Sequence, residues 1–168
     1  MQDRFDEAEK ELRRILERWP DFAEAHNNLA LTLQRVGRGQ DAERAARESL
    51  RLLPEQRDAR MTLAAILHDQ GRYLEEVAVL EPLAGSAARD VQVAARYGVA
   101  LEAAGEFRAA APLLEAALAV TPQEIGLLLP AARCAEALGD PTGAIRLYER
   151  AAQTAAPGAA RAEALSAI

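Results

Sequence analysis

The sequence predicts an all-α fold, an α-solenoid built from antiparallel helix pairs, and two observations predict it. Four glycines recur at a constant interval of 34 residues: Gly37, Gly71, Gly105 and Gly139. Apolar residues at helical spacing recur between them, and a repeat of this length with helical periodicity is typical of stacked helix pairs. Composition agrees, since 50% of the residues are hydrophobic but only 4% are aromatic, as expected where alanine-mediated helix contacts dominate.

Other columns of the alignment agree with the glycines. Seven residues before each glycine stands a small residue: Ala30, Ala64, Gly98 and Ala132. A second small column follows the glycines and reads Ala42, Glu76, Ala110 and Ala144, with Ala8 in the same frame at the start. We expect both columns to let the two helices of a pair approach closely. The recurring glycines end the first helices, because glycine adopts the left-handed conformation without a steric penalty.

The alignment divides one array over residues 1–168 into repeats: a partial repeat 1–22, repeats 23–56, 57–90, 91–124 and 125–158, and a terminal helix 159–168. An unpaired second helix is predicted at about 4–18. Helix pairs are predicted at about 23–36 and 40–52, 57–70 and 73–85, 90–104 and 107–119, and 122–138 and 141–154, with a short last helix at 159–167.

Residues near two helix starts predict caps. Asp140 with Pro141 is typical of an N-cap followed by the first helical position, and Thr121 with Glu124 has the spacing of a capping box.

Three prolines fall within predicted helices: Pro82 and Pro112 in second helices, and Pro130 in the first helix of the last pair. Pro112 lies near a first turn and should be tolerated. Pro82 and Pro130 lie deeper, where proline removes a backbone hydrogen bond. We therefore predict bent or shortened helices at both positions and expect residues 122–154 to be the least regular pair.

This pattern resembles the tetratricopeptide repeat. In residues 23–56 the family columns hold His26, Leu29, Ala30, Leu33, Ala42, Ala46, Ser49 and Pro54. In residues 91–124 they hold Ala94, Tyr97, Gly98, Leu101, Ala110, Leu114, Ala117 and Pro122. The resemblance implies a right-handed superhelix that acts as a non-catalytic scaffold for protein–protein interaction, with the first helix of each repeat lining a concave groove.

That groove would contain the candidate ligand-binding residues Asn27, Asn28, Leu31, Met61, Thr62, His68, Arg96, Val99 and Arg133. Asparagine amides can hold the backbone of an extended peptide, and arginines can pair with its carboxylates. We therefore expect a peptide or a partner helix as the ligand, held by Asn28 and Arg96 with Met61 and Leu31 as apolar contacts.

Structural roles for the same residues stay open. Arg96 and Arg133 could pair with Glu102 and Glu136 without touching a ligand, Asn27 and Asn28 could be merely solvated, and Met61 could be a packing residue. His26 is expected in the core with its polar edge satisfied. Cys134 is expected to be a small buried hydrophobe.

One known ligand class can be compared residue by residue. Chaperone-tail receptors of this family use a carboxylate clamp of two lysines, two asparagines and an arginine. The matching positions are Asn27, Leu31, Thr62, Gln92 and Arg96, of which only the arginine agrees. A ligand of this kind is therefore disfavoured.

Composition excludes several function classes. A net charge of −6 and a pI near 5.1 disfavour nucleic-acid binding. A single cysteine excludes an internal disulfide and a cysteine-cluster zinc site. The chain has no apolar run long enough for membrane insertion, and the cytoplasm is the expected compartment. Arginine and alanine richness suggests a bacterial source of high GC content.

No catalytic motif is recognisable, so no enzyme activity, cofactor or metal is expected. His68 and Asp69 are adjacent on a helix and point about 100° apart, which prevents them from converging as a catalytic pair. Two alternatives stay open. The array could recruit substrate within a larger enzyme of the glycosyltransferase or sulfotransferase kind, or it could self-assemble weakly, with the last helix of one copy docking head-to-tail on the unpaired first helix of another.

Overall fold

The computed structural model describes residues 2–155, 162, 165 and 166. Contacts divide the chain into two compact units, Met1–Leu80 and Glu81–Ile168, named below the N-terminal unit and the C-terminal unit. Each unit is described separately.

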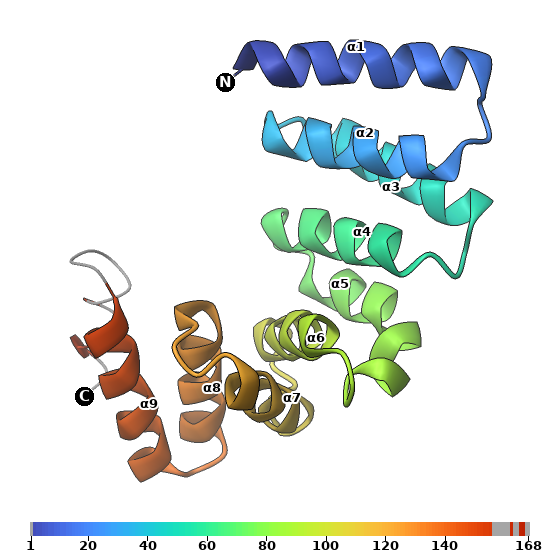
Figure 1. Ribbon diagram of the computed structural model, residues 1–168. Helices are drawn as coiled ribbons and strands as arrows, with labels where there is room; N and C mark the ends of the chain where they lie inside the picture. Colours follow the sequence, from blue (N-terminus) through green and yellow to red (C-terminus); the bar gives the residue numbers. More distant parts are fainter. Residues whose placement is uncertain (1, 156–161, 163–164, 167–168) are drawn as a thin grey trace. The chain divides into compact units, whose positions relative to one another are not determined.

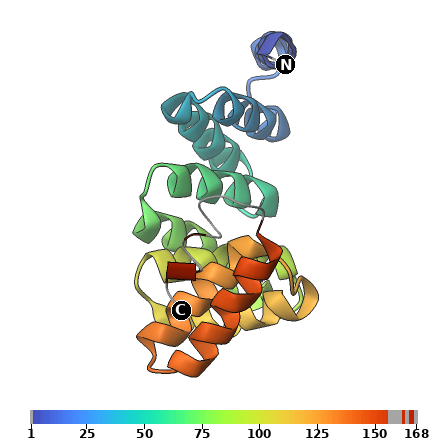
Figure 2. The ribbon, with the colours of Figure 1, turned by 90° about the vertical axis from the view of Figure 1, so that its left-hand side faces the viewer.

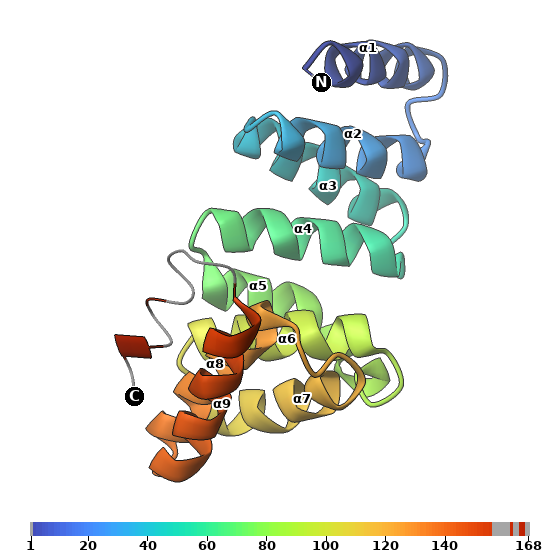
Figure 3. The same ribbon diagram turned by 60° about the vertical axis from the view of Figure 1, so that its left-hand side comes forward.

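The N-terminal unit consists of α1 (Gln2–Arg18), α2 (Ala23–Arg35), α3 (Gly39–Leu52), α4 (Arg57–Asp69) and α5 (Tyr73–Leu80). Helices α2 and α3 form one pair and α4 and α5 another, while α1 packs against α2 without a partner helix of its own. Figures 1 and 3 show α1, α2 and α4 stacked in one layer with α3 behind α2. The core between them includes Leu29, Leu33, Leu63, Ile66 and Leu67.

The C-terminal unit begins with a 3₁₀ segment, η1 (Glu81–Ser86), followed by α6 (Val91–Ala103), α7 (Phe107–Val120), α8 (Ile125–Ala137) and α9 (Pro141–Thr154). Helices α6 and α7 form one pair and α8 and α9 the next. The second of these pairs lies side by side in Figure 2, in orange and red. The core of the C-terminal unit includes Val93, Leu114 and Leu128, all 0% exposed.

The four recurring glycines end the first helices as predicted. Their φ angles are 78°, 71°, 84° and 83°, and among the described residues they alone have positive φ. Each turn also makes the same backbone bond, seen after α2 as Arg38 N donating to Leu33 O at 2.9 Å. This is the Schellman pattern, which satisfies carbonyls at a helix end.

The small-residue column is buried as predicted. Ala30, Ala64 and Ala132 are each 0% exposed. A Cβ added to Gly98 would lie 3.0 Å from Cγ of Leu114, which is closer than ordinary van der Waals contact. The crossing of α6 and α7 therefore requires a small residue at this position.

Two of the expectations about prolines and caps are confirmed. Helix α5 ends at Leu80 and gives way to η1 around Pro82. Asp140 caps α9 by accepting a hydrogen bond from Gly143 N at 2.9 Å, with Pro141 as the first helical residue.

The capping box predicted at Thr121 and Glu124 is wrong, and the shortening predicted as one outcome at Pro130 is not seen. Thr121 and Glu124 form no capping box: α8 begins only at Ile125, Glu124 makes no side-chain cap, and the Thr121 hydroxyl donates back to Ala117 O. Pro130 does not shorten α8, which has 13 residues, as many as α2, α4 and α6. The least regular of the second helices is α5, with eight residues, although the least regular pair was expected at residues 122–154.

Pro112 and Pro130 are in fact equivalent, because each is the sixth residue of its helix. Each leaves one carbonyl without its usual donor, and the helix continues. Pro130 is also buried, so packing of its ring offsets part of the lost hydrogen bond. The helix expected at 159–167 lies outside the described residues except for 162, 165 and 166, which are helical.

Candidate functional site

In the N-terminal unit the candidate residues lie on the two first helices, α2 and α4, which are in contact. Asn28 is exposed and Leu31 is 39% exposed. They are three residues apart and therefore share one face of α2. Met61 on α4 is half-buried. Gln34 of α2 donates to Asp69 Oδ2 of α4 at 2.7 Å and ties the ends of the two helices together.

Asn27 differs from its neighbour Asn28 in being buried. Its side chain is only 7% exposed, and its Oδ1 has no hydrogen-bond partner among the described residues. An unsatisfied buried carbonyl oxygen costs about 1–3 kcal/mol. Asn27 therefore carries an unused acceptor beside the exposed face of α2.

Two other candidates of this unit are engaged in internal bonds. Thr62 is 6% exposed and its hydroxyl donates to Asp58 O at 2.9 Å. His68 Nδ1 lies 2.8 Å from Oε2 of Glu76 on α5, and its ring tilts against that of Tyr73 with centroids 5.4 Å apart. His26 is half-buried, with Nε2 2.8 Å from Pro20 O.

Glu76 was visible in the sequence only as a departure from a column of alanines. The structure shows a carboxylate that is 0% exposed, on a helix whose counterparts carry Ala42, Ala110 and Ala144 at this position. A carboxylate is almost never fully buried unless it is paired, and the bond from His68 provides that partner.

In the C-terminal unit the candidates lie on α6 and α8. Arg96 and Val99 are half-buried. Arg133 forms a two-pronged pair with Glu102, Nε to Oε1 at 2.8 Å and Nη2 to Oε2 at 3.0 Å, and Glu102 is 8% exposed. The structural alternative foreseen for Arg133, pairing with a carboxylate of the neighbouring first helix, is confirmed.

The N-terminal unit also contains two ion-pair sets, on its second helices and the turns before them, that were not predicted from the sequence. The first ion-pair set consists of Glu9, Arg13, Arg38 and Asp41, and the second ion-pair set of Glu43, Arg47, Arg72 and Glu75. Every member of the second set follows its counterpart by 34 residues. Charges aligned at the repeat interval were the signal that could have revealed them.

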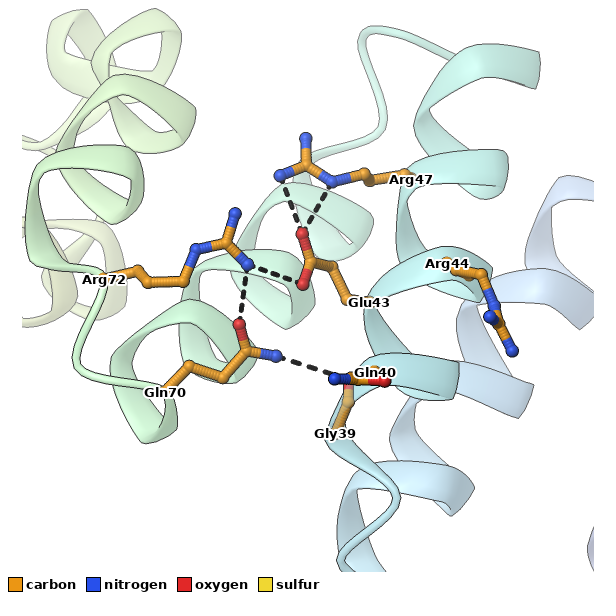
Figure 4. A pocket seen from close by; sticks show the side chains of 7 residues that line it. All are labelled: Gly39, Gln40, Glu43, Arg44, Arg47, Gln70 and Arg72. Atoms are coloured by element: carbon orange, nitrogen blue, oxygen red, sulfur yellow. Dashed lines mark hydrogen bonds and ion pairs between the residues drawn. The ribbon is translucent and has the colours of Figure 1, made fainter.

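Both sets join consecutive repeats. Arg38 donates to Glu9 Oε1 at 2.8 Å and also pairs with Asp41. Arg72 donates to Glu43 Oε2 at 2.7 Å and to Glu75 Oε2 at 2.6 Å. Figure 4 shows Glu43 held between Arg47 and Arg72, while Arg44 points away from it.

These contacts shift the pKa values of the carboxyl and guanidinium groups that make them. A hydrogen bond from Arg13 holds the pKa of Glu9 below its ordinary value, with Arg38 adding to the effect against partial burial. Burial alone would raise the pKa of Glu43, but hydrogen bonds from Arg47, Arg72 and Gln70 outweigh it and the pKa lies below its ordinary value. Hydrogen bonds to Glu75 and Glu43 raise the pKa of Arg72.

Among the described residues, no three His, Cys, Asp or Glu side chains are grouped so as to hold a metal ion. Cys134 is 1% exposed, and burial raises its pKa to about 11. Within the same part of the chain, no helix is both long enough and apolar enough to span a bilayer.

Comparison with known proteins identifies the family. A model described as tetratricopeptide repeat matches residues 2–35, 28–91 and 96–160. The chain belongs to the tetratricopeptide repeat family. This agrees with the Schellman glycines and the buried small-residue column, and it confirms the predicted all-α solenoid class. No curated protein matches the chain.

Several solved structures share this tetratricopeptide fold. YrrB, described as a TPR protein with an unusual peptide-binding site, has a TM-score of 0.81 and 15% identity over 98% of this chain and 84% of its own. MamA 41-end from Desulfovibrio magneticus RS-1 has a TM-score of 0.75 and 19% identity over 89% of this chain and 83% of its own. MamA AMB-1 has a TM-score of 0.78 and 20% identity over 90% and 89%. At these identities the likeness concerns the fold.

Proposed function

We propose that this protein is a non-catalytic scaffold for protein–protein interaction, and that the α2/α4 face of its N-terminal unit binds an extended peptide or a partner helix. Membership of the tetratricopeptide repeat family supports the general role. The peptide-binding site stated for YrrB, which shares the fold, is a precedent for a peptide ligand.

The exposed pair of Asn28 and Leu31 on one face of α2 carries the proposal. Asn28 presents an exposed amide that can both donate to and accept from a peptide backbone. Leu31 and Met61 provide the apolar contacts beside this amide.

The remaining candidates act less directly in this proposal. The Thr62 hydroxyl donates to Asp58 O within α4, and its oxygen can still accept a hydrogen bond from a ligand. His68 positions Glu76, and Arg133 positions Glu102. Arg96 and Val99 belong to a separate face of the C-terminal unit, where an acidic ligand group would pair with the guanidinium.

The test compares two double variants of the N-terminal unit. Asn28→Ala with Leu31→Asp alters the proposed face, and Gln40→Ala with Leu74→Asp makes the same kind of change at exposed positions of the second helices. Each protein is immobilised and incubated with lysate of the source organism, and captured proteins are quantified by mass spectrometry. Circular dichroism checks that both variants keep the wild-type helicity.

Partners captured by the wild type and the control variant but lost with Asn28→Ala/Leu31→Asp would support the proposed face. Equal capture by all three proteins would refute it. Loss only in the control would move the binding surface to the second helices.

A second candidate role, self-association through α1, is favoured by one observation. Ala8, Leu12 and Ile15 of α1 are half-buried, whereas their counterparts on α3, Ala42, Ala46 and Ser49, are each 0% exposed beneath α2. This face of α1 could accept a first helix from another copy, and Leu165 is 56% exposed. Light scattering over a concentration series tests it, because a strict monomer at high concentration excludes head-to-tail docking.

A further inference from the structure

The C-terminal unit carries an apolar groove between its helices α7, α8 and α9. Helices α7, α8 and α9 enclose a volume of about 440 Å³. Its apolar lining comprises Ala111, Leu118, Ala131, Ala135, Leu138 and Leu147. Leu138 is 43% exposed, so solvent reaches the apolar surface. A volume of this size lies in the range typical of small ligand sites.

The repeat alignment explains why this groove is apolar. The four positions equivalent to the second ion-pair set are Ala111, Glu115, Asp140 and Gly143, and all four line the groove. In the N-terminal unit the corresponding depression, of about 830 Å³, is lined by Glu43, Arg47 and Arg72, which are bonded to one another (Figure 4). Because Ala111 and Gly143 replace the charged partners Glu43 and Glu75, the ion-pair set of the N-terminal unit has no counterpart in the groove of the C-terminal unit.

Charges of opposite sign stand beside the apolar lining. Glu115 on α7 and Arg146 on α9 make no hydrogen bond or ion pair within the part of the chain that the structure describes. Asp140, at the start of α9, uses one acceptor position for its cap and has others left. Arg146 is the sixth residue of α9, about 9 Å along the axis from Asp140, which is the length of about three residues of an extended chain.

We propose that this groove docks a short extended segment of a partner protein whose large aliphatic side chain enters the apolar lining. A basic residue of the segment faces Glu115 and Asp140, and an acidic residue about three positions away faces Arg146. Charge complementarity selects this occupant over a small anion, because the groove floor is apolar. This groove is formed by α7, α8 and α9 and goes beyond the α2/α4 face proposed above.

The test is a titration of ¹⁵N-labelled full-length protein followed by NMR. The matched probe is a glycine-flanked peptide with the core Lys-Leu-Ala-Glu, and the control probe has the reversed core Glu-Leu-Ala-Lys. The matched peptide should shift the amides of Ala135, Leu138 and Arg146 and bind roughly tenfold more tightly than the reversed peptide, since two exposed charge contacts are exchanged for repulsions. Shifts confined to α2 and α4 would concern the other proposed face.

A charge-swapped protein sharpens the experiment. Glu115→Lys with Arg146→Glu should invert the preference in favour of the reversed peptide. Arg108→Glu with Glu149→Lys makes the same charge change at exposed positions outside the groove and should leave the preference unchanged.

Four results would overturn the proposal. These are equal binding of both peptides to the wild type, an unchanged preference in the charge-swapped protein, no groove shifts at about millimolar peptide, and groove shifts caused by raising the protein concentration alone. The last result would identify a second copy of the chain as the occupant.

Discussion

The buried pair of His68 and Glu76 predicts an unusual asymmetry between two alanine substitutions. Nδ1 of His68 lies 2.8 Å from Oε2 of Glu76, with 32% of the histidine side chain exposed and 0% of the glutamate. Taking a carboxylate out of water costs several kcal/mol, and its partner repays that cost only in part. Removing the partner and removing the carboxylate should therefore have different consequences.

His68→Ala leaves the carboxylate in place without its imidazole bond. A hydrogen bond to a charged group contributes about 1.5–3 kcal/mol, and the ring contact with Tyr73 adds about 0.5 kcal/mol. We expect a loss of about 2–3 kcal/mol in the free energy of unfolding. For a chain of 168 residues this corresponds to about 5–10 °C in melting temperature.

Glu76→Ala loses the same bond but also removes the buried charge. The histidine left behind is one third exposed and can bond to water. Alanine also fits the site, since Ala42, Ala110 and Ala144 occupy the equivalent positions at 0%, 0% and 4% exposure. We expect Glu76→Ala to stay within about 1 kcal/mol of the wild type, and the double variant to recover most of the stability lost by His68→Ala.

The assay is urea denaturation followed by circular dichroism and by tryptophan fluorescence. Trp19 is the single tryptophan and lies in the N-terminal unit, so its emission reports on that unit. His26→Ala is the matched control, because His26 bonds to the carbonyl of Pro20 and not to a buried charge. If Glu76→Ala is as destabilising as His68→Ala, the carboxylate is not a burden to the fold and the reasoning fails.

Three further outcomes are expected. Gly105→Val should lower the free energy of unfolding by about 2 kcal/mol, because φ is +84° while an added Cβ would meet nothing within 4 Å. Gly105→Asn should lower it less, and equal melting temperatures of the two variants would contradict this explanation by backbone conformation. Arg72→Met should lower the free energy of unfolding at pH 7, where Glu43 and Glu75 are ionised. The pKa values of both carboxyls lie below their ordinary value of 4.5, so they stabilise the fold above 4.5 and lose this effect as the pH falls through the lowered values, where the variant should match the wild type. A difference that persists when both carboxyls are protonated would assign the loss to packing. Cys134 should react with iodoacetamide only as the C-terminal unit opens, since burial raises its pKa to about 11; alkylation of the native protein as fast as of the unfolded chain would contradict its burial.

Backbone-determined features of the fold were predictable from the sequence. A left-handed turn accepts glycine far more readily than other residues, so Gly37, Gly71, Gly105 and Gly139 located the ends of the first helices correctly. Capping signals were less reliable, because they depend on which residue begins the helix. Thr121 and Glu124 have the spacing of a capping box, yet α8 starts after both of them.

The candidate site was harder to predict because its side chains have competing partners. Periodicity placed Asn27 and Asn28 on a first helix, but only the packing determines that one is 7% exposed and the other open to solvent. Arg133 could equally have faced a ligand, and its pairing depends on Glu102, 31 positions earlier. Such choices are made by tertiary contacts that a single helix does not encode.

The repeat alignment is most informative where its columns disagree in chemistry. A column that alternates between alanine and a buried glutamate marks a position where the backbone accepts a small residue and a charge is tolerated only with a partner, as at Glu76. A column that holds Glu43 in one repeat and Ala111 two repeats later marks a depression that is lined by ion-paired side chains in the first and by mostly apolar side chains in the second. Because the backbone is similar in every repeat, these differences act as substitutions already made within one chain. In our proposal, the ion-pair sets of the N-terminal unit join its repeats to one another, whereas the apolar groove of the C-terminal unit, with Glu115 and Arg146 beside it, is left for a partner.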